Sequence, residues 1–326
     1  MLKGFHALLL VLLTLVGGSA WSTETGAGPA AYPPAPVEME LKKLSDHVYY
    51  VQGKAGTAVD NAGFISNAAA IITDAGIVVV DALGSPSLAW EFRQLLKKVT
   101  DKPVVKVIVT HYHADHIYGL QLFKAEGAEI IGPAGYSEYV DAPIARQRLA
   151  ERRQSLAPWV NEKTRIIEPD VVVDRNATLK MGDVTLEILY LGAAHSDGDL
   201  AVLVKEDRVL ISGDIIFEGR VPFTGNADTA HWLAVLENLD KTGLKALLPG
   251  HGPAADDPAE AVKLTLNYLR TVRDAMQRGV DEMLSFDEAY EQADWSEFEQ
   301  LPAFDATHRR NAYGVYLSLE AASLGQ

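Results

Sequence analysis

A histidine-rich segment directly after a β-branched run is the feature that most constrains how this chain can fold. The run VVKVIVT (104–110) has the composition of a buried strand, and HYHADH (111–116) follows it without a break. Three of the nine histidines of the chain stand in these six residues. Neither packing nor helix capping requires three imidazoles together, whereas neutral imidazoles are common metal ligands. The pattern therefore predicts a metal site at the end of a strand.

The periodicity of apolar residues predicts strands and helices in the order β-rich, α, β-rich, α. Expected strands cover 48–53, two segments of 68–83 joined by a turn at 74–76, 104–110, 128–132, antiparallel strands within 177–192 and 200–214, and the start of 245–252. Expected helices cover 85–99, 119–127, roughly 135–155, 229–243 with its end at Gly243, and most of 258–326. This order predicts two sheets packed face to face with helices outside, built as two similar halves.

The composition restricts the classes of function. The chain has 326 residues, of which 48% are hydrophobic and 22% charged, as in a soluble globular protein with a full core. A formal net charge of −15 argues against nucleic acid or an anionic membrane surface as a partner. There is no cysteine, so disulfides, thiolate zinc sites and a thiol nucleophile are excluded. Any metal must be held by His, Asp or Glu.

The N-terminus has the pattern of an export signal. Lys3 precedes a short apolar run at 7–16, and small residues at 17–20 offer a cleavage site after Ala20. An uncleaved anchor or an N-terminal core helix is the alternative interpretation. We expect a signal peptide at 1–20, a Pro/Gly/Ala-rich linker at 21–38 and a folded domain at 39–326. The expected product is periplasmic or secreted, without a stable membrane anchor after cleavage.

Three further residues stand in similar contexts, at strand ends or in the loops that follow them. They are His195 in LGAAHSDGDL, Asp214 in RVLISGDIIF and His251 in LPGHGP. His111 and His113 are two apart, so in an extended loop they point the same way and can bind one cation. Asp115 and His116 lie further on and can face a second cation. A carboxylate such as Asp214 suits the bridge that two nearby cations need.

The order THYHADH, a lone histidine, SGD and PGHG resembles the metallo-β-lactamase superfamily of metallohydrolases over about residues 40–255. The resemblance implies a four-layer αββα sandwich, with extra C-terminal helices from about 256. It implies one metal bound by His111, His113 and His195, and a second bound by Asp115, His116 and His251. Asp214 and a water or hydroxide would bridge the two metals. Asp81, at the end of IVVVDAL, matches a position that orients a ligand imidazole.

The chemistry expected of such a site is hydrolysis of a small-molecule substrate. Two Zn²⁺ ions per chain are expected, with iron or manganese as alternatives. A metal-bridging hydroxide would attack an ester, thioester, lactone or amide-type carbonyl, and Asp115 would orient that hydroxide and take its proton. Asp214 argues against a typical β-lactamase, because the family branches with that activity have Cys or Ser there, whereas glyoxalase II relatives keep Asp. The export signal and the segments 213–223 and 308–320 resemble a periplasmic branch associated with quinoprotein relay or sulfur oxidation.

Other functions remain open at this point. β-Lactam hydrolysis uses the same core, and persulfide dioxygenases use it with one iron ion held by two His and an Asp. A non-enzymatic alternative is a periplasmic metal-binding or partner-docking module, which an open coordination position disfavours. The metal count separates these classes, since about two zinc ions favour hydrolysis and about one iron ion favours oxygenation. The sequence sets no expectation for the oligomeric state.

Residues close to the predicted ligands are candidates for substrate contacts. Tyr118 follows the ligand cluster, and Arg220, Phe223 and Asn226 follow Asp214; each can instead serve packing. Other polar residues are weaker candidates for a functional role. His47 and His231 are expected to be structural, and His6 is removed with the signal peptide. The stretch HRRNAYGVY (308–316), with His308, Arg309 and Arg310, is either a basic cluster or a solvated helix face.

Overall fold

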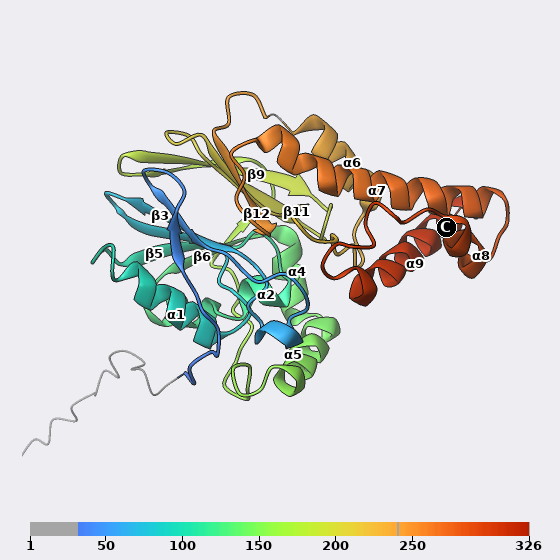
Figure 1. Ribbon diagram of the computed structural model, residues 1–326. Helices are drawn as coiled ribbons and strands as arrows, with labels where there is room; N and C mark the ends of the chain where they lie inside the picture. The colour runs from blue at the N-terminus through green and yellow to red at the C-terminus, as the bar shows by residue number, and fades with distance from the viewer. Residues whose placement is uncertain (1–31, 240, 326) are drawn as a thin grey trace, which may run out of the picture.

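Two β-sheets that lie face to face, with helices on both outer sides, form the centre of the computed structural model (Figure 1). The structure describes residues 32–239 and 241–325. The expected signal peptide at 1–20 lies outside the described residues, as does most of the expected linker. The arrangement confirms the predicted α+β fold, an αββα sandwich with extra C-terminal helices.

The first sheet comes from the N-terminal half of the chain. Its order is β1 (Leu41–Lys43), β2 (Val48–Val51), β3 (Ala68–Thr73), β4 (Gly76–Val80), β5 (Val104–Ile108), β6 (Glu129–Pro133) and β7 (Val171–Val173). β1 to β4 are antiparallel, whereas β4 to β7 are parallel and connected through helices. β5 lies inside the parallel part, so the histidine segment leaves the sheet at its carboxyl edge.

The second sheet is mostly antiparallel. Its order is β12 (Ala246–His251), β11 (Val209–Phe217), β10 (Asp199–Val204), β9 (Val184–Gly192) and β8 (Ala177–Met181). Only the β11–β12 pair is parallel, and its register shifts between Ile211 and Gly213 and again before Phe217. These irregularities surround Asp214, and bulges of this kind commonly redirect a side chain.

Helices cover the outer faces of the two sheets (Figure 1). Those of the first half are α1 (Pro86–Leu96), α2 (Ala114–Ile117), α3 (Leu120–Ala125), α4 (Ala134–Asp141) and α5 (Pro143–Ser155). The second half contributes α6 (Thr229–Asn238), α7 (Pro258–Asp281), α8 (Phe286–Gln292) and α9 (Phe304–Ser323), of which α8 and α9 pack against α7 beyond the edge of the sheet. None of these described helices is both long and apolar enough to cross a membrane.

The core has three layers, which is what a four-layer sandwich requires. Along β4, Ile77 and Val79 face the helices of the first half, while Val78 and Val80 face the second sheet. Alternation of this kind is the period-2 geometry of a strand buried on both faces. A third cluster joins the second sheet to α6, α7 and α9. At about 25 cal/mol per Å² of buried apolar surface, these layers supply the main stabilisation of the fold.

Two predicted helices differ from the observed ones. The stretch 135–155 is two helices, because Pro143 lacks an N–H and holds Ala142 in an extended conformation (φ −66°, ψ 146°). The helix expected to end at Gly243 ends at Asn238 instead. Leu239 is extended there (φ −61°, ψ 118°) and packs on the core, so tertiary packing ends the helix before the glycine.

The described end of the expected linker lies against the folded core. Tyr32, Ala35 and Val37 pack on the helical side of the first sheet. Trp159 donates a hydrogen bond from its indole nitrogen to the carbonyl of Pro34 at 2.9 Å. These contacts attach residues 32–38 to the domain that was expected to begin near Met39.

Candidate metal centre

The seven predicted ligands come from four places in the chain and meet at one edge of the sandwich. His111 and His113 follow β5, and the short helix α2 carries Asp115 and His116. The other three positions belong to the second sheet: His195 lies in the loop from β9 to β10, Asp214 inside β11, and His251 at the end of β12. Asp214 is thus within a strand and not, as expected, at its end, because the bulged register of β11 interrupts the ladder there.

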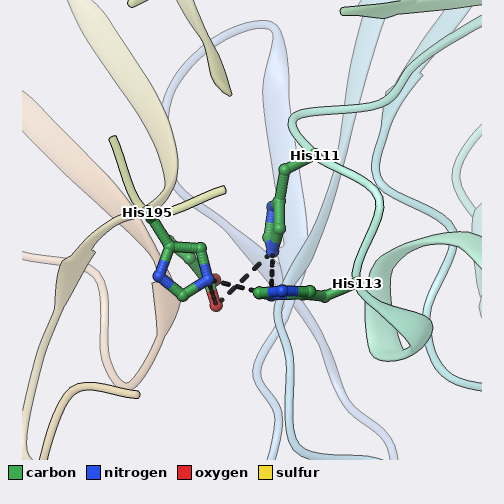
Figure 2. A group of neighbouring side chains, drawn as sticks. His111, His113 and His195 are labelled. Atoms are coloured by element: carbon green, nitrogen blue, oxygen red, sulfur yellow. Dashed lines mark hydrogen bonds and ion pairs between the residues drawn. The ribbon is translucent and has the colours of Figure 1, made fainter. Parts of the chain in front are cut away.

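The first ligand group joins three imidazoles and one carboxylate. Figure 2 shows His111, His113 and His195 converging on one point. Nδ1 of His113 lies 3.1 Å from Nε2 of His111 and 2.9 Å from Nε2 of His195. Oδ2 of Asp214 lies 3.7 Å from Nε2 of His111 and 3.3 Å from that of His195. Three ring nitrogens facing one point is the geometry of a cation site, since neutral imidazoles bind metals through such nitrogens.

The second ligand group consists of Asp115, His116 and His251. Oδ2 of Asp115 lies 3.6 Å from Nε2 of His116 and 3.3 Å from Nε2 of His251. Asp214 reaches this group as well, with Oδ1 at 3.2 Å from His116 and Oδ2 at 3.2 Å from His251. The carboxylate of Asp214 therefore lies between the two groups, where a bridging ligand belongs.

Hydrogen bonds from outside the ligand groups orient the imidazoles. Oδ2 of Asp81 lies 2.8 Å from Nδ1 of His116, which leaves Nε2 to face the site. The backbone N–H and the hydroxyl of Thr110 both donate to Asp81 at 2.8 Å. Nδ1 of His251 lies 2.7 Å from the carbonyl oxygen of Ile65. Asp81 thus has the position expected of it, at a backbone φ of 61° that non-glycine residues seldom adopt.

Glycines let the two halves approach closely around Asp214. A Cβ atom on Gly250 would lie 2.0 Å from Oδ1 of Asp214, and one on Gly213 would lie 2.6 Å from Cβ of Thr110. Gly213 also has a φ of 53°, in the left-handed region. The SGD and PGHG segments therefore need their glycines for space as well as for turn geometry.

The electrostatics of the site favour bound positive charge. Burial lowers the pKa of His113 to about 4 and that of His195 to about 3. Burial also opposes the charge on His116, but Asp214 and Asp81 outweigh it and hold the pKa of His116 well above its usual range. Burial opposes the charge on Asp214 too, yet His251 and His116 hold its pKa well below the usual range. The neutral imidazoles of His113 and His195 beside the ionised carboxylate of Asp214 are donors that suit a divalent cation.

Buried polar atoms of the ligand groups support a metal site. Nε2 of His116 and Oδ1 of Asp214 have no hydrogen-bond partner among residues 32–239 and 241–325, although both are buried. Buried polar atoms without a partner are rare, and each calls for an explanation. These two atoms lie 3.2 Å from each other, so a metal that both bind accounts for them. The residues present fit a zinc-type centre.

A cavity of about 870 Å³ opens beside the second ligand group. Its wall includes Asp115, Asp214 and His251, so substrate and ligands share one space. The apolar part comes from residues that flank the site: Val59, Tyr112, Tyr139, Ile144, Phe217 and Phe223. A cavity of this size suits a small molecule, with the ligands at its base.

The residues predicted to contact the substrate lie in different parts of the structure. Arg220, Phe223 and Asn226 line the cavity, as expected. Tyr118 does not, because its ring is fully buried in the core of the first half. His47 pairs with Asp207 at 2.7 Å and joins two turns, and His231 lies 2.9 Å from the carbonyl of Leu191. These two histidines have structural contacts.

The basic stretch in α9 is divided between core and cavity. His308 is fully buried among aromatic rings, so a solvated face is wrong for this residue. Arg309 is exposed and pairs with Asp287, whereas Arg310 lines the cavity. All three residues are polar, so the sequence does not indicate which of them the helix buries in the core.

Several cavity residues were not predicted. Tyr112 lies between two ligands and stacks on Tyr139 with ring centroids 4.3 Å apart. Its hydroxyl donates to Asp197 at 2.8 Å. Arg148 and Arg152 reach the cavity from α5. The alternation within HYHADH signals that Tyr112 faces away from the histidines, but nothing in the sequence indicates that α5 covers the site.

Comparison with known proteins agrees with the ligand pattern. The family model of the metallo-beta-lactamase superfamily matches residues 61–251. A metallo-beta-lactamase type 2 from Elizabethkingia meningoseptica is 24% identical over 264 residues, which cover 79% of this chain and 92% of that protein. One from Bacillus cereus is 26% identical over 207 residues, which cover 62% of this chain and 71% of that protein.

Solved structures show the same fold. A metallo-beta-lactamase from Pontibacter korlensis superposes with a TM-score of 0.57 at 20% identity, covering 72% of this chain and 99% of the other. The stereoselective inverting sec-alkylsulfatase from Pseudomonas sp. gives a TM-score of 0.64 at 18% identity, covering 86% of this chain but 50% of its own. The family match spans more than half of the chain and contains all seven candidate ligands. The chain belongs to the metallo-beta-lactamase superfamily of metal-dependent hydrolases.

Proposed function

We propose that this chain is an exported, binuclear metal-dependent hydrolase that cleaves an ester, thioester, lactone or amide-type carbonyl of a small molecule. The observation that carries the proposal is the position of Asp214. Its carboxylate lies 3.3 Å from Nε2 of His195 in one ligand group and 3.2 Å from Nε2 of His251 in the other. A carboxylate shared in this way is what a two-metal site requires.

The seven candidate ligands form two metal-binding groups. His111, His113 and His195 would hold one ion, and Asp115, His116 and His251 the other; Zn²⁺ suits these donors, with iron or manganese as alternatives. Two such ions, when bound, would acidify a shared water and polarise a carbonyl. Asp115 lies at the cavity wall, where its carboxylate can orient a nucleophile and accept its proton.

A sulfate ester is a second candidate substrate class. The sec-alkylsulfatase structure covers 86% of this chain, more than the 72% covered by the Pontibacter lactamase. Asp214 at the bridging position argues against β-lactams, because the lactamase branches of the family have Cys or Ser there.

Export is part of the proposal. What supports it is the short apolar run at 7–16 between Lys3 and the small residues at 17–20. Expressed with its own N-terminus in a bacterium, the mature protein is expected to begin at Trp21. Intact mass spectrometry of the purified protein checks this, and a mass that retains residues 1–20 would refute periplasmic or secreted localisation.

The test of the proposed activity is a substrate panel. The zinc-loaded protein is expected to hydrolyse at least one of 4-nitrophenyl butyrate, a butyryl thioester, a γ-lactone, nitrocefin or octan-2-yl sulfate. Chelation should abolish the rate, and added Zn²⁺ should restore it. Oxygen consumption with glutathione persulfide, supported by a single iron ion, would instead identify a dioxygenase. A fully loaded protein that is inactive on all of these would favour a metal-binding module.

A further inference from the structure

His195 differs from His116 and His251 in how its imidazole is held. Nδ1 of His116 lies 2.8 Å from Oδ2 of Asp81, and Nδ1 of His251 lies 2.7 Å from the carbonyl oxygen of Ile65. Nε2 of His195 faces the other ligands, but its Nδ1 is buried and has no hydrogen-bond partner among the residues that the structure describes. A metal-ligating imidazole is normally oriented through its second nitrogen. Other contacts must therefore fix the direction of the His195 side chain.

Asp199, the first residue of β10, bonds the backbone on both sides of His195. Its Oδ2 accepts hydrogen bonds from the N–H of Ala194 at 3.1 Å and from the N–H of Ser196 at 2.9 Å. Its Oδ1 accepts from the hydroxyl of Ser196 at 3.0 Å. The two N–H groups belong to the residues directly before and after His195. One carboxylate therefore fixes the planar peptide units that flank the ligand.

The carboxyl group of Asp199 is buried without a positive partner. The residue is 2% exposed, and no Lys, Arg or His in the described part of the chain forms a salt bridge with it. Burial raises the pKa of Asp199 to about 7, although the hydrogen bonds from Ser196 and Ala194 lower it. An acidic group in such a place costs free energy, which packing alone does not justify. What the acidic group provides is the set of acceptors for the backbone around His195.

The same position connects the two halves of the ligand set. The N–H of Leu200 donates to the carbonyl of Thr110 at 2.8 Å, and Thr110 directly precedes His111. β10 also lies inside the second sheet, between β9 and β11. Asp199 and Leu200 therefore join the loop of His195 to the end of β5, where the first histidines of the site begin.

Aromatic rings complete the surroundings of His195. The centre of its ring lies 5.0 Å from that of Trp232 and 5.6 Å from that of Phe217. These contacts restrict rotation of the imidazole, because close-packed neighbours leave little room for other rotamers. They do not determine where the backbone carries the ring. That position depends on the hydrogen bonds of Asp199.

We propose that Asp199 is the positioning residue of His195, and that it holds this ligand through the N–H groups of the two adjacent residues instead of through the imidazole. The proposal rests on the proposed two-metal function and adds a residue on which the first ligand group depends. The hydrogen bonds of Asp199 carry this role, and its charge does not. An amide of the same shape can therefore replace it, because the oxygen of Asn accepts both N–H groups and its nitrogen donates to the hydroxyl of Ser196.

Metal binding by three variants separates hydrogen bonding from charge. Asp199→Ala removes the acceptors, and Asp199→Glu keeps the charge but moves the carboxylate by one methylene. Both should weaken the binding of one Zn²⁺ ion by about 10–100-fold, the usual effect of losing a residue that orients a ligand. Asp199→Asn should stay within about threefold of the wild type. Calorimetric titration of metal-free protein with Zn²⁺ measures the affinities, and the visible spectrum of Co²⁺-loaded protein should be that of the wild type in Asp199→Asn alone.

Asp207→Ala is the matched control. Asp207 is also a buried aspartate, 8% exposed, and it accepts hydrogen bonds from the hydroxyl of Ser45 and the N–H of His47 beyond the opposite end of β10. Its removal should leave zinc affinity unchanged. Equal losses of affinity in Asp207→Ala and Asp199→Ala would show a general effect of lost stability and overturn the assignment. Circular dichroism shows whether each variant is folded.

Hydrogen exchange tests Asp199 without metal. In metal-free protein, a peptide that contains residues 194–196 should exchange at least about tenfold faster in Asp199→Ala and Asp199→Glu than in the wild type, because these amides lose their acceptor. Asp199→Asn should exchange like the wild type. Mass spectrometry after digestion measures these rates. If Asp199→Ala and Asp199→Glu do not fold, Asp199→Asn decides alone, since weaker zinc binding in a folded amide variant would contradict a role based on hydrogen bonds.

The two measurements distinguish failure of this proposal from failure of the metal centre. If the wild type binds two Zn²⁺ ions and the affinity does not depend on Asp199, the positioning role is wrong and the metal centre stands, whatever the exchange rates. If the wild type binds no Zn²⁺ while exchange at 194–196 depends on Asp199, the two-metal hydrolase is wrong and Asp199 still fixes the backbone around His195.

Discussion

Asp115 differs from Asp214 in its access to the cavity, and this difference separates their roles. The side chain of Asp115 is 19% exposed, whereas that of Asp214 is 4% exposed. A buried carboxylate between two ligand groups suits bridging, and a carboxylate at the cavity wall suits proton transfer near the substrate. The two residues are therefore expected to respond differently to substitution.

Asp115→Asn keeps the shape of the side chain and removes the base. The substitution should lower kcat by about 10²–10⁴-fold, the usual contribution of general acid–base catalysis, and leave the melting temperature nearly unchanged. Steady-state kinetics and thermal melting, both on protein with measured zinc content, check this. Near-full turnover at unchanged zinc content would show that Asp115 is not the proton acceptor.

Gly250→Ala tests the close approach of the two halves. The new Cβ would lie 2.0 Å from Oδ1 of Asp214 and 2.7 Å from the carbonyl carbon of Gly213, so the shared carboxylate must move. We expect zinc content to fall to about one ion or fewer per chain, by loss of the bridge. Gly314→Ala is the control, because its nearest neighbour lies 3.4 Å away. Unchanged zinc content in Gly250→Ala would show that Asp214 does not need its observed position.

At the same scale, the sequence predicts ligands better than it predicts substrate contacts. The spacing of His111, His113 and His116 identifies ligands because the chemistry of imidazole is local and no packing rule competes with it. The positions of Tyr118 and His308 were left open between alternatives, because the side of a helix that meets the core is decided by tertiary packing.

Among the elements, the C-terminal helices hold the cavity loop 218–226 in place. Asn311, buried in α9, accepts a hydrogen bond from the N–H of Thr224 at 3.1 Å and donates to the carbonyl of Pro222 at 2.7 Å. The N–H of Val221 donates to the carbonyl of Pro302 at 3.1 Å. The helical extension is thus connected to the loop that carries Arg220 and Phe223.

Asn311→Ala removes both loop contacts and leaves two buried backbone groups unpaired. It should cost about 2–4 kcal/mol of unfolding free energy and raise KM without loss of zinc, because the loop contributes to the cavity and not to the ligand groups. Urea unfolding and kinetics measure both effects. Asn238→Ala, at an exposed position in α6, is the control; equal effects of the two substitutions would mean that α9 does not position the loop.

His308 makes the stability of the helical extension depend on pH. Burial lowers its pKa to about 4, below the usual 6.5. Between these pH values the imidazole is protonated in the unfolded chain and neutral in the folded chain. Its contribution is complete above pH 6.5 and is lost as the pH falls from about 6.5 toward 4, with a slope of at most about 1.4 kcal/mol per pH unit. Urea unfolding at pH 7.5 and 5.0 should show a smaller loss for His308→Phe than for wild type, and equal losses would contradict the assignment.

Element boundaries show where sequence patterns stop being sufficient. The strands β2 to β6 were predicted closely because β-branched runs between turns are strong local signals, whereas β1 and β7, of three residues each, were not predicted. The division of 135–155 at Pro143 follows from proline stereochemistry and was missed because the surrounding polar residues favour one long helix. The early end of α6 depends on Leu239 packing against the core, which no local signal encodes.

For the whole molecule, the net charge does not describe the cavity. A formal net charge of −15 predicts affinity for cations, whereas the cavity wall combines four arginines with five acidic residues. The four-layer arrangement was predictable from the order of elements and the family resemblance. The cavity was not, because it forms where α5, the loop after β11 and α9 converge from distant parts of the chain.

The central claim is that five histidines and two aspartates hold a pair of metal ions. Metal analysis of the purified mature protein by inductively coupled plasma mass spectrometry, after saturation with Zn²⁺ and removal of excess, tests it most directly. We expect two zinc ions per chain in the wild type. Asp214→Ala should hold one or fewer, with a circular dichroism spectrum that shows the fold is retained. One ion or none in the wild type, or an Asp214→Ala variant that still holds two, would contradict a shared two-metal centre.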